Sequence, residues 1–116
     1  MNVPYKVHKE QDIKTETSDK NKRCVLFQSG FYKCILVINP FYCDYRKTNN
    51  SILGHLEFYA LSEGWEKYTS TGYRSTFFHH LNIKQYQNDD FVAQEFKKML
   101  EKDGFLFEES IQVTLF

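Results

Sequence analysis

Long apolar runs, an excess of one charge and recognisable catalytic motifs are all missing from this 116-residue sequence. A membrane-spanning helix needs about 20 consecutive apolar residues. The chain has no such run, so we expect no membrane partner. The N-terminus is polar from the start and lacks the apolar core of a signal peptide. These absences predict a small soluble protein of the cytoplasm.

Cysteine is scarce and odd in number, with Cys24, Cys34 and Cys43 as the complete set. An odd set cannot pair completely within one chain, and two of the three lie in apolar runs, as buried free thiols in a reducing compartment do. Together with His55 they lack the close Cys-x-x-Cys spacing that is typical of structural zinc sites. We therefore expect no metal and no cofactor.

Catalytic signatures are absent as well. The chain has no Gly-x-Ser-x-Gly elbow, no P-loop and no Rossmann glycine pattern. The neighbouring pair His79 and His80 would point to opposite sides of a strand. We therefore predict a protein that is not an enzyme. A small enzyme or binding protein for an anionic metabolite stays open as an alternative, with Arg74 holding the anion and His79 or His80 as the base.

Charge is balanced overall, with 15 basic and 15 acidic side chains, but the C-terminal part is acidic. Residues 89–116 hold seven acidic and three basic side chains. Nucleic-acid binders normally carry a basic excess, because phosphate neutralisation supplies most of their affinity. An acidic surface of Glu95, Glu101, Glu108 and Glu109 could instead contact a basic protein, although a solvated helix face gives the same pattern.

Three strands are expected in the first half of the chain. Residues 24–27 and 31–38 are rich in aromatic and β-branched side chains, and the short link 28–30 ends in glycine, which predicts a β-hairpin. Pro40 is expected to stop the second strand at Asn39, with a loop over 41–51. Residues 52–61 are apolar on both alternating faces, which predicts a central strand.

One helix is expected over about 90–103. Asn88 offers an N-cap, and Gly104 offers a C-terminal stop. Residues 105–115 alternate as a final strand would, whereas 62–88 is irregular, and its part 77–83 fits a strand or a helical turn equally well. The order β-β-β-(irregular)-α-β predicts an α+β fold, with a mainly antiparallel sheet of four or five strands and one helix packed on one face.

The N-terminal residues 1–22 are polar and have no sustained period, so we expect an arm outside the globular domain of residues 23–116. Val3, Tyr5 and Val7 alternate within this arm. It is therefore expected to be either flexible or a short edge strand.

The densest group of polar side chains lies at residues 69–77. As a binding loop it would use Thr71, Gly72, Tyr73, Arg74 and Ser75, with Trp65 and His79 close by in the sequence. As a structural feature, Gly72 would form a turn, Tyr73 would pack, and Arg74 would pair with Glu57 or Glu66. Both interpretations stay open at this stage.

The run 71–77, T-G-Y-R-S-T-F, follows the strand-like stretch 54–58. Together they resemble a T-G-Y-R-S-x-F pattern in short uncharacterised proteins of bacterial mobile elements. The resemblance covers only these two stretches and implies a phage or plasmid origin. It gives no residue a chemical role, because those proteins have no established chemistry.

Taken together, these features favour a non-enzymatic module that binds another protein. Aromatic residues make up 17% of the chain and suit a contact surface. The most concrete version is a phage- or plasmid-encoded inhibitor of a host defence enzyme, acting by steric occlusion or by charge mimicry; a homodimer is also conceivable. The alternative is a nucleic-acid-binding module, with the stacking side chains Tyr73, Trp65 and Phe77 and the phosphate ligands Arg46, Lys47 and Arg74.

Overall fold

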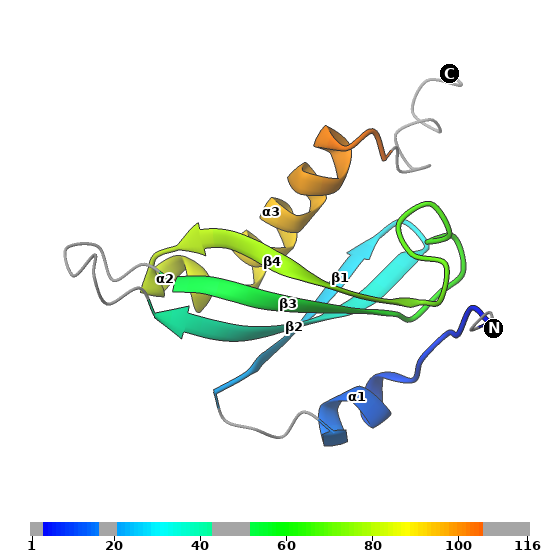
Figure 1. Ribbon diagram of the computed structural model, residues 1–116, viewed down its shortest axis with the longest axis horizontal. Coiled ribbons are helices and arrows are strands. Elements are labelled where there is room, and N and C mark those ends of the chain that lie inside the picture. The colour runs from blue at the N-terminus through cyan, green and yellow to red at the C-terminus, as the bar shows by residue number, and fades with distance from the viewer. Residues whose placement is uncertain (1–3, 17–20, 43–51, 106–116) are drawn as a thin grey trace.

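Four antiparallel strands follow one another in the sheet in the same order as in the chain. β1 (Arg23–Ser29), β2 (Tyr32–Tyr42), β3 (Ile52–Ala60) and β4 (Tyr73–Leu81) form this meander in the computed structural model, which describes residues 4–16, 21–42 and 52–105 (Figure 1). The predicted α+β class with an antiparallel sheet is confirmed. β3 is central, as its two apolar faces predicted.

The β1–β2 hairpin turns at Gly30, which adopts a left-handed φ of 61°, and pairs Ser29 with Tyr32. The expectation that Pro40 stops the second strand is wrong, because β2 continues to Tyr42. β1 begins at Arg23 opposite Ile38, so at Pro40 the strand β2 is paired with β3 alone. A proline lacks an N–H and is tolerated where one side of a strand is unpaired.

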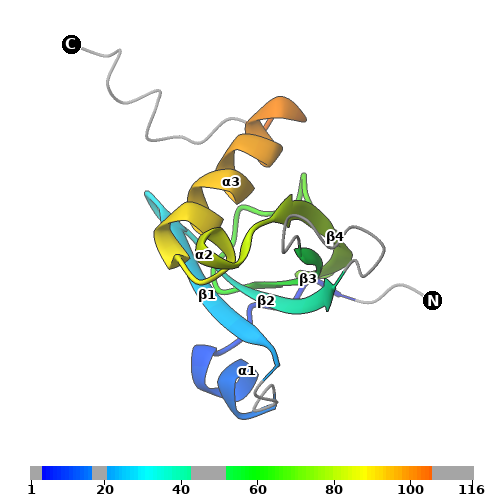
Figure 2. The same ribbon diagram turned by 90° about the vertical axis from the view of Figure 1, so that its left-hand side faces the viewer.

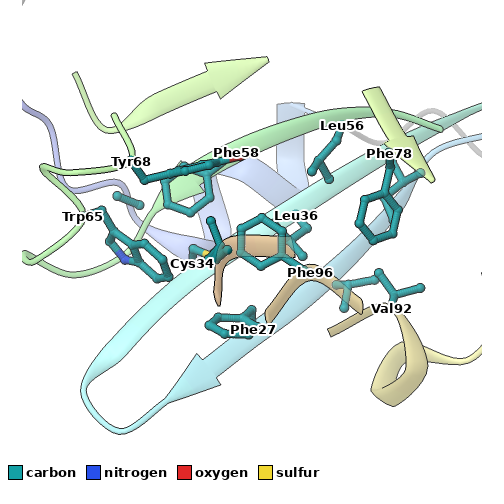
Figure 3. Close-up of a cluster of buried hydrophobic side chains, with 14 of the residues drawn as sticks. Phe27, Cys34, Leu36, Leu56, Phe58, Trp65, Tyr68, Phe78, Val92 and Phe96 are labelled. Carbon is teal, nitrogen blue, oxygen red and sulfur yellow. The ribbon is translucent and has the colours of Figure 1, made fainter. Parts of the chain in front are cut away.

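The main core lies between the sheet and the C-terminal helices. α2 (Ile83–Tyr86) and α3 (Asp89–Lys102) cover one face, and α3 inserts Val92, Phe96 and Leu100. Edge-on ring contacts join Phe27, Trp65 and Phe96, with centroids 5.3–6.0 Å apart (Figure 3). Such rings each bury about 150–250 Å², which explains how a chain of this size forms a core without disulfides between its described cysteines.

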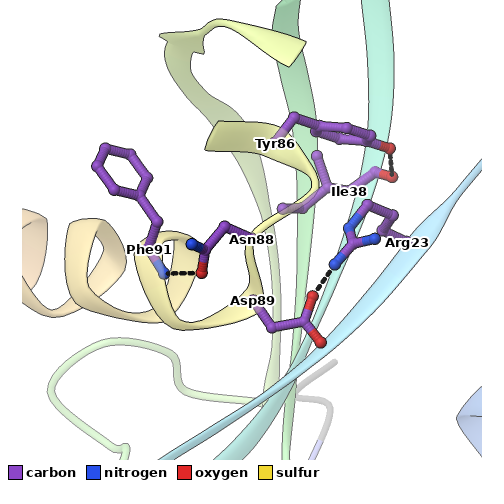
Figure 4. Close-up of polar contacts among 6 residues, drawn as sticks. All are labelled: Arg23, Ile38, Tyr86, Asn88, Asp89 and Phe91. Atoms are coloured by element: carbon purple, nitrogen blue, oxygen red, sulfur yellow. Dashed lines mark hydrogen bonds and ion pairs between the residues drawn. The ribbon is translucent and has the colours of Figure 1, made fainter. Parts of the chain in front are cut away.

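Caps and polar contacts fix the start of α3. The Asn88 side chain accepts a 3.0 Å hydrogen bond from the Phe91 N–H, which confirms the predicted N-cap, and Asp89 forms an ion pair with Arg23 of β1 (Figure 4). The Tyr86 hydroxyl donates to the Ile38 carbonyl of β2 over 3.5 Å. The helix ends before Gly104, whose φ is 93°, as the sequence predicted.

The opposite face of the sheet is partly covered by α1 (Glu10–Glu16), a helix that the sequence did not predict (Figure 2). Its one buried side chain, Ile13, packs against Ile35 and Val37 of β2. Residues 4–9, which precede α1, form no strand, and His8 donates its N–H to the Ala60 carbonyl over 2.7 Å. The described part of the N-terminal arm is therefore a cover for the second face.

β4 and α2 both fall within residues 62–88, the stretch expected to be irregular. The strand alternative holds up to Leu81, and the helical turn begins at Ile83. The predicted final strand over 105–115 lies outside the described residues except for Phe105, which packs on Trp65 with ring centroids 5.6 Å apart. No helix in the described part of the chain is long and apolar enough to cross a bilayer.

Candidate binding surface

The hydroxyl groups of Thr69 and Thr71 cap the outer edge of β4. The Ala60 N–H donates to the Gly72 carbonyl over 2.8 Å, so the even-numbered residues at the start of β4 form the backbone hydrogen bonds to β3. The N–H and C=O groups of Tyr73 therefore point away from β3, toward the free edge of the sheet. Thr69 Oγ1 donates to the Tyr73 carbonyl over 2.7 Å, and Thr71 Oγ1 accepts from the Tyr73 N–H over 3.3 Å. Thr71, expected as a binding residue, therefore has a structural role.

Gly72 is structural for a different reason. Its φ of 86° is left-handed, and a Cβ built there would lie 2.1 Å from the Lys6 carbonyl oxygen. The Lys6 N–H donates to the Thr71 carbonyl over 2.9 Å, so the N-terminal segment passes directly over this turn. The glycine gives that segment room to approach.

Arg74 lies opposite Phe58 on the α3 side of the sheet, away from Tyr73. Its guanidinium lies 4.5 Å from the centroid of the Tyr68 ring, and Nη1 donates to the Tyr68 carbonyl over 2.9 Å. The expected pairing of Arg74 with Glu57 or Glu66 is not seen. Glu57 lies opposite Ser75 on the other face of the sheet and accepts a hydrogen bond from Tyr73. Arg74 and Tyr73 therefore cannot act on one ligand from the same face.

Trp65 is fully buried, and its Nε1–H donates to the Lys33 carbonyl over 3.0 Å. Figure 3 shows the indole within the core beside Phe58. It is therefore not available to bind a partner or to stack on a base. His79 is exposed beside Phe78, with ring centroids 5.3 Å apart, and Ser75 and Tyr73 are exposed on the face opposite α3.

The clearest exposed apolar group lies on that same face, next to the part that α1 covers. We define the aromatic face as Phe41, Leu53, His55, Tyr73 and Phe77, which come from β2, β3 and β4. Phe77 is 60% exposed, Phe41 48% and Tyr73 37%. The Phe77 ring centroid lies 6.2 Å from that of Phe41 and 5.5 Å from that of His55.

Polar contacts hold the aromatic face in place. His55 Nε2 lies 2.6 Å from Ser75 Oγ, and the Tyr73 hydroxyl donates to Glu57 Oε2 over 2.8 Å. Burial, followed by the Glu57 carboxylate, raises the pKa of Tyr73. Tyr73 also packs edge-on against Tyr59, with ring centroids 5.1 Å apart. The face therefore has ordered rings before any partner arrives.

A hollow of about 560 Å³ adjoins the Tyr73 end of the aromatic face. Its lining comes from the N-terminal segment and the turn before β4, and includes Pro4, Tyr5, Lys6, His8, Thr71 and Tyr73. The Tyr5 hydroxyl donates to the Ser62 carbonyl over 2.9 Å, which fixes one wall. The hollow extends the contact area that a partner could use.

The four acidic residues proposed as one surface are not brought together within the described residues. Glu95 is half-buried and forms an ion pair with Lys98 over 3.3 Å, whereas Glu101 is exposed near the end of α3. Glu108 and Glu109 lie outside the described residues. Exposed ion pairs of this kind contribute about 0–1 kcal/mol, so they give the helix little of its stability.

Cys24 and Cys34 lie on opposite faces of the sheet. Cys34 is buried in the main core, where burial raises the pKa of its thiol, and Cys24 packs on the other face near Ile13. Cys43 lies outside the described residues. Among the residues that the structure describes, no group of three His, Cys, Asp or Glu side chains could hold a metal ion.

Comparison with protein-family models, with curated proteins and with solved structures gives no match for this chain. A proposal for its function therefore rests on the geometry of this surface. Sequence reasoning missed Phe41 and His55, because it placed Phe41 in a loop and considered His55 only as a metal ligand. They could have been found by taking the residues that alternate toward one face of β3 and aligning them with their partners on the two neighbouring strands.

Proposed function

We propose that this protein is a binding module for another protein and that the aromatic face is its contact surface. The observation that carries the proposal is the exposure of Phe77 and Phe41 in contact with each other on an ordered sheet. Clustered exposed apolar side chains mark interaction sites, and aromatic residues are enriched among those that dominate binding energy.

A protein partner is favoured over a nucleic acid by the chemistry of the same face. The aromatic face contains no lysine or arginine, and Glu57 lies beside Tyr73. Two members of the proposed nucleic-acid site are unsuitable, since Trp65 is buried and Arg74 lies on the α3 side. Arg46 and Lys47 of that site lie outside the described residues. Single-strand binding needs stacking rings together with a basic groove, and the aromatic face supplies only the rings.

The concrete version is an inhibitor that blocks a surface of its target by steric occlusion. The target would be a host defence enzyme if the T-G-Y-R-S-x-F resemblance reflects a phage or plasmid origin. Occlusion is favoured over charge mimicry, because Glu95 is already paired with Lys98 and the aromatic face contains no acidic side chain. Inhibition by steric occlusion would require no catalytic group from this chain.

Affinity capture from bacterial lysate tests the proposal, with wild type, Phe77→Glu and Phe31→Glu run side by side. Phe31 is the matched control, because it is 57% exposed but lies at the β1–β2 turn. We expect one stoichiometric protein with wild type and with Phe31→Glu, and its loss with Phe77→Glu. Equal capture by all three proteins, or capture of nucleic acid alone, would contradict the proposal.

A further inference from the structure

We propose that a second copy of this chain pairs with the free edge of β4, antiparallel and centred on Thr76. β4 is the last strand of the sheet in Figure 2, so one side of it has no neighbouring strand among the described residues. Edge strands of this kind are templates for pairing with another chain. This interaction is separate from the partner protein proposed above.

The pattern of hydrogen bonds identifies which groups are free. Because Gly72 bonds to Ala60, residues 74 and 76 bond to β3, and the odd residues Ser75 and Phe77 direct their N–H and C=O groups away from it. No described residue makes a backbone hydrogen bond with these outward groups of Ser75 or Phe77. They are four groups in a row along the edge that no described residue pairs.

Both ends of this edge are closed. At one end, Thr69 Oγ1 donates a hydrogen bond to the outward Tyr73 carbonyl and Thr71 Oγ1 accepts one from the outward Tyr73 N–H. At the other end the register shifts between Leu53 and His55, so β4 has one extra residue there. Bulges of this kind turn an edge away from further pairing. The available edge is therefore short and includes Ser75, Thr76 and Phe77.

A two-fold axis at Thr76 satisfies all four free groups. It places Ser75 opposite Phe77 of the second copy and Phe77 opposite its Ser75, and each of these two pairs exchanges two hydrogen bonds. Thr76 faces Thr76 of the second copy, so no charged side chain of this short edge meets its own copy. Both Phe77 rings lie on the same side of the joined sheet, which makes the two aromatic faces continuous.

Disulfide trapping tests the register. In a chain with Cys24→Ala and Cys43→Ala, Thr76→Cys would face its own copy at a Cβ separation of about 4.5–5.5 Å, close to the distance that a disulfide spans. Ser75→Cys is the matched control, because it would lie about 7–8 Å or more from its counterpart. We expect most of the Thr76→Cys protein, and only background amounts of Ser75→Cys, to form covalent dimers on mild oxidation.

Sedimentation equilibrium of the wild-type chain supplies the second measurement. We expect the apparent mass to rise toward that of a dimer with concentration, and Thr76→Lys to remain monomeric. Thr76→Lys places two like charges directly opposite each other across the two-fold axis. The Thr76 side chain lies opposite Leu56 on the α3 side of the sheet, away from the aromatic face, so the variant separates self-pairing from partner binding. Equal trapping of both cysteine variants, or a wild-type mass that stays monomeric at millimolar concentration, would overturn the proposal.

Discussion

The ring of His8 packs edge-on against the ring of Tyr59, with centroids 5.2 Å apart. This contact joins the N-terminal segment to the centre of the sheet, next to the backbone bond from His8 to Ala60. The segment thereby covers one part of the second face, while the aromatic face beside it stays open. The division of this face into a covered and an open part underlies the predictions below.

Acidification should loosen the N-terminal segment. Burial, followed by the charge of Lys6, lowers the pKa of His8 below 6.5, although Glu16 opposes the shift. His8 therefore binds a proton more readily when the N-terminal segment is detached from the sheet than when it is docked. Docking is strongest above pH 6.5 and weakens as the pH falls below that value. Hydrogen exchange of the Lys6 and His8 amides, corrected for intrinsic rates, should show less protection at low pH. A His8→Gln variant should lose this dependence, and an unchanged dependence would refute the assignment.

Ile13→Ala should destabilise the protein by about 2 kcal/mol, the lower end of the range for buried isoleucine. Ile13 is the buried side chain of α1 and covers Ile35 and Val37, but the helix lies at the surface and can adjust. Urea denaturation measures the effect, with Gln11→Ala on the exposed side as the control. A change in Ile13→Ala no larger than that of the control would show that α1 adds nothing to the core.

Replacing Thr69 and Thr71 together by valine should remove the cap of β4. The Tyr73 carbonyl would lose both hydroxyl donors, and a typical intramolecular hydrogen bond contributes about 0.5–1.5 kcal/mol to stability. The free edge would also grow by one residue, so self-association should increase. Thermal unfolding and sedimentation measure the two effects. Full stability together with unchanged mass would contradict the capping role.

Gly72→Ala and Gly104→Ala separate backbone strain from steric contact. Both glycines are left-handed, with φ of 86° and 93°, which costs about 1–2 kcal/mol for an L-residue. A Cβ on Gly104 meets nothing within 4 Å, whereas one on Gly72 meets the Lys6 carbonyl. Gly72→Ala should therefore be the more destabilising. Deleting residues 1–9 should make the two substitutions equally destabilising. Denaturation of both variants and of the unsubstituted protein, each with and without residues 1–9, measures this.

Several elements were predictable because their signals are local. α3 carries a cap, an apolar stripe and a terminal glycine, and β3 is apolar on both faces, so each was located to within about two residues. The end of β2 was misplaced because the cost of Pro40 in a strand depends on whether a second strand is paired on its other side. α1 was missed because Ile13 is its one buried residue. Strand pairing and burial both depend on the tertiary structure, which the local sequence does not contain.

The binding surface was less predictable than the fold. Tyr73 was identified, but its neighbour Arg74 points to the other side of the sheet, as adjacent residues of a strand must. Phe41 and His55 meet Phe77 only through the register of three strands. The hydroxyl-rich segment was considered as a recognition loop, yet Thr69 and Thr71 both donate their hydroxyl hydrogen bonds to the Tyr73 carbonyl.

Affinity measurement with the captured partner tests the central claim most directly. Isothermal titration should compare wild type with Phe77→Ala, Phe41→Ala and Phe31→Ala. Binding hot spots cost 2 kcal/mol or more on truncation, which is about a 30-fold loss of affinity. We predict a loss of that size for Phe77→Ala or Phe41→Ala and a change of less than about threefold for Phe31→Ala. Equal affinities for all four proteins would contradict the assignment of the aromatic face as the binding surface.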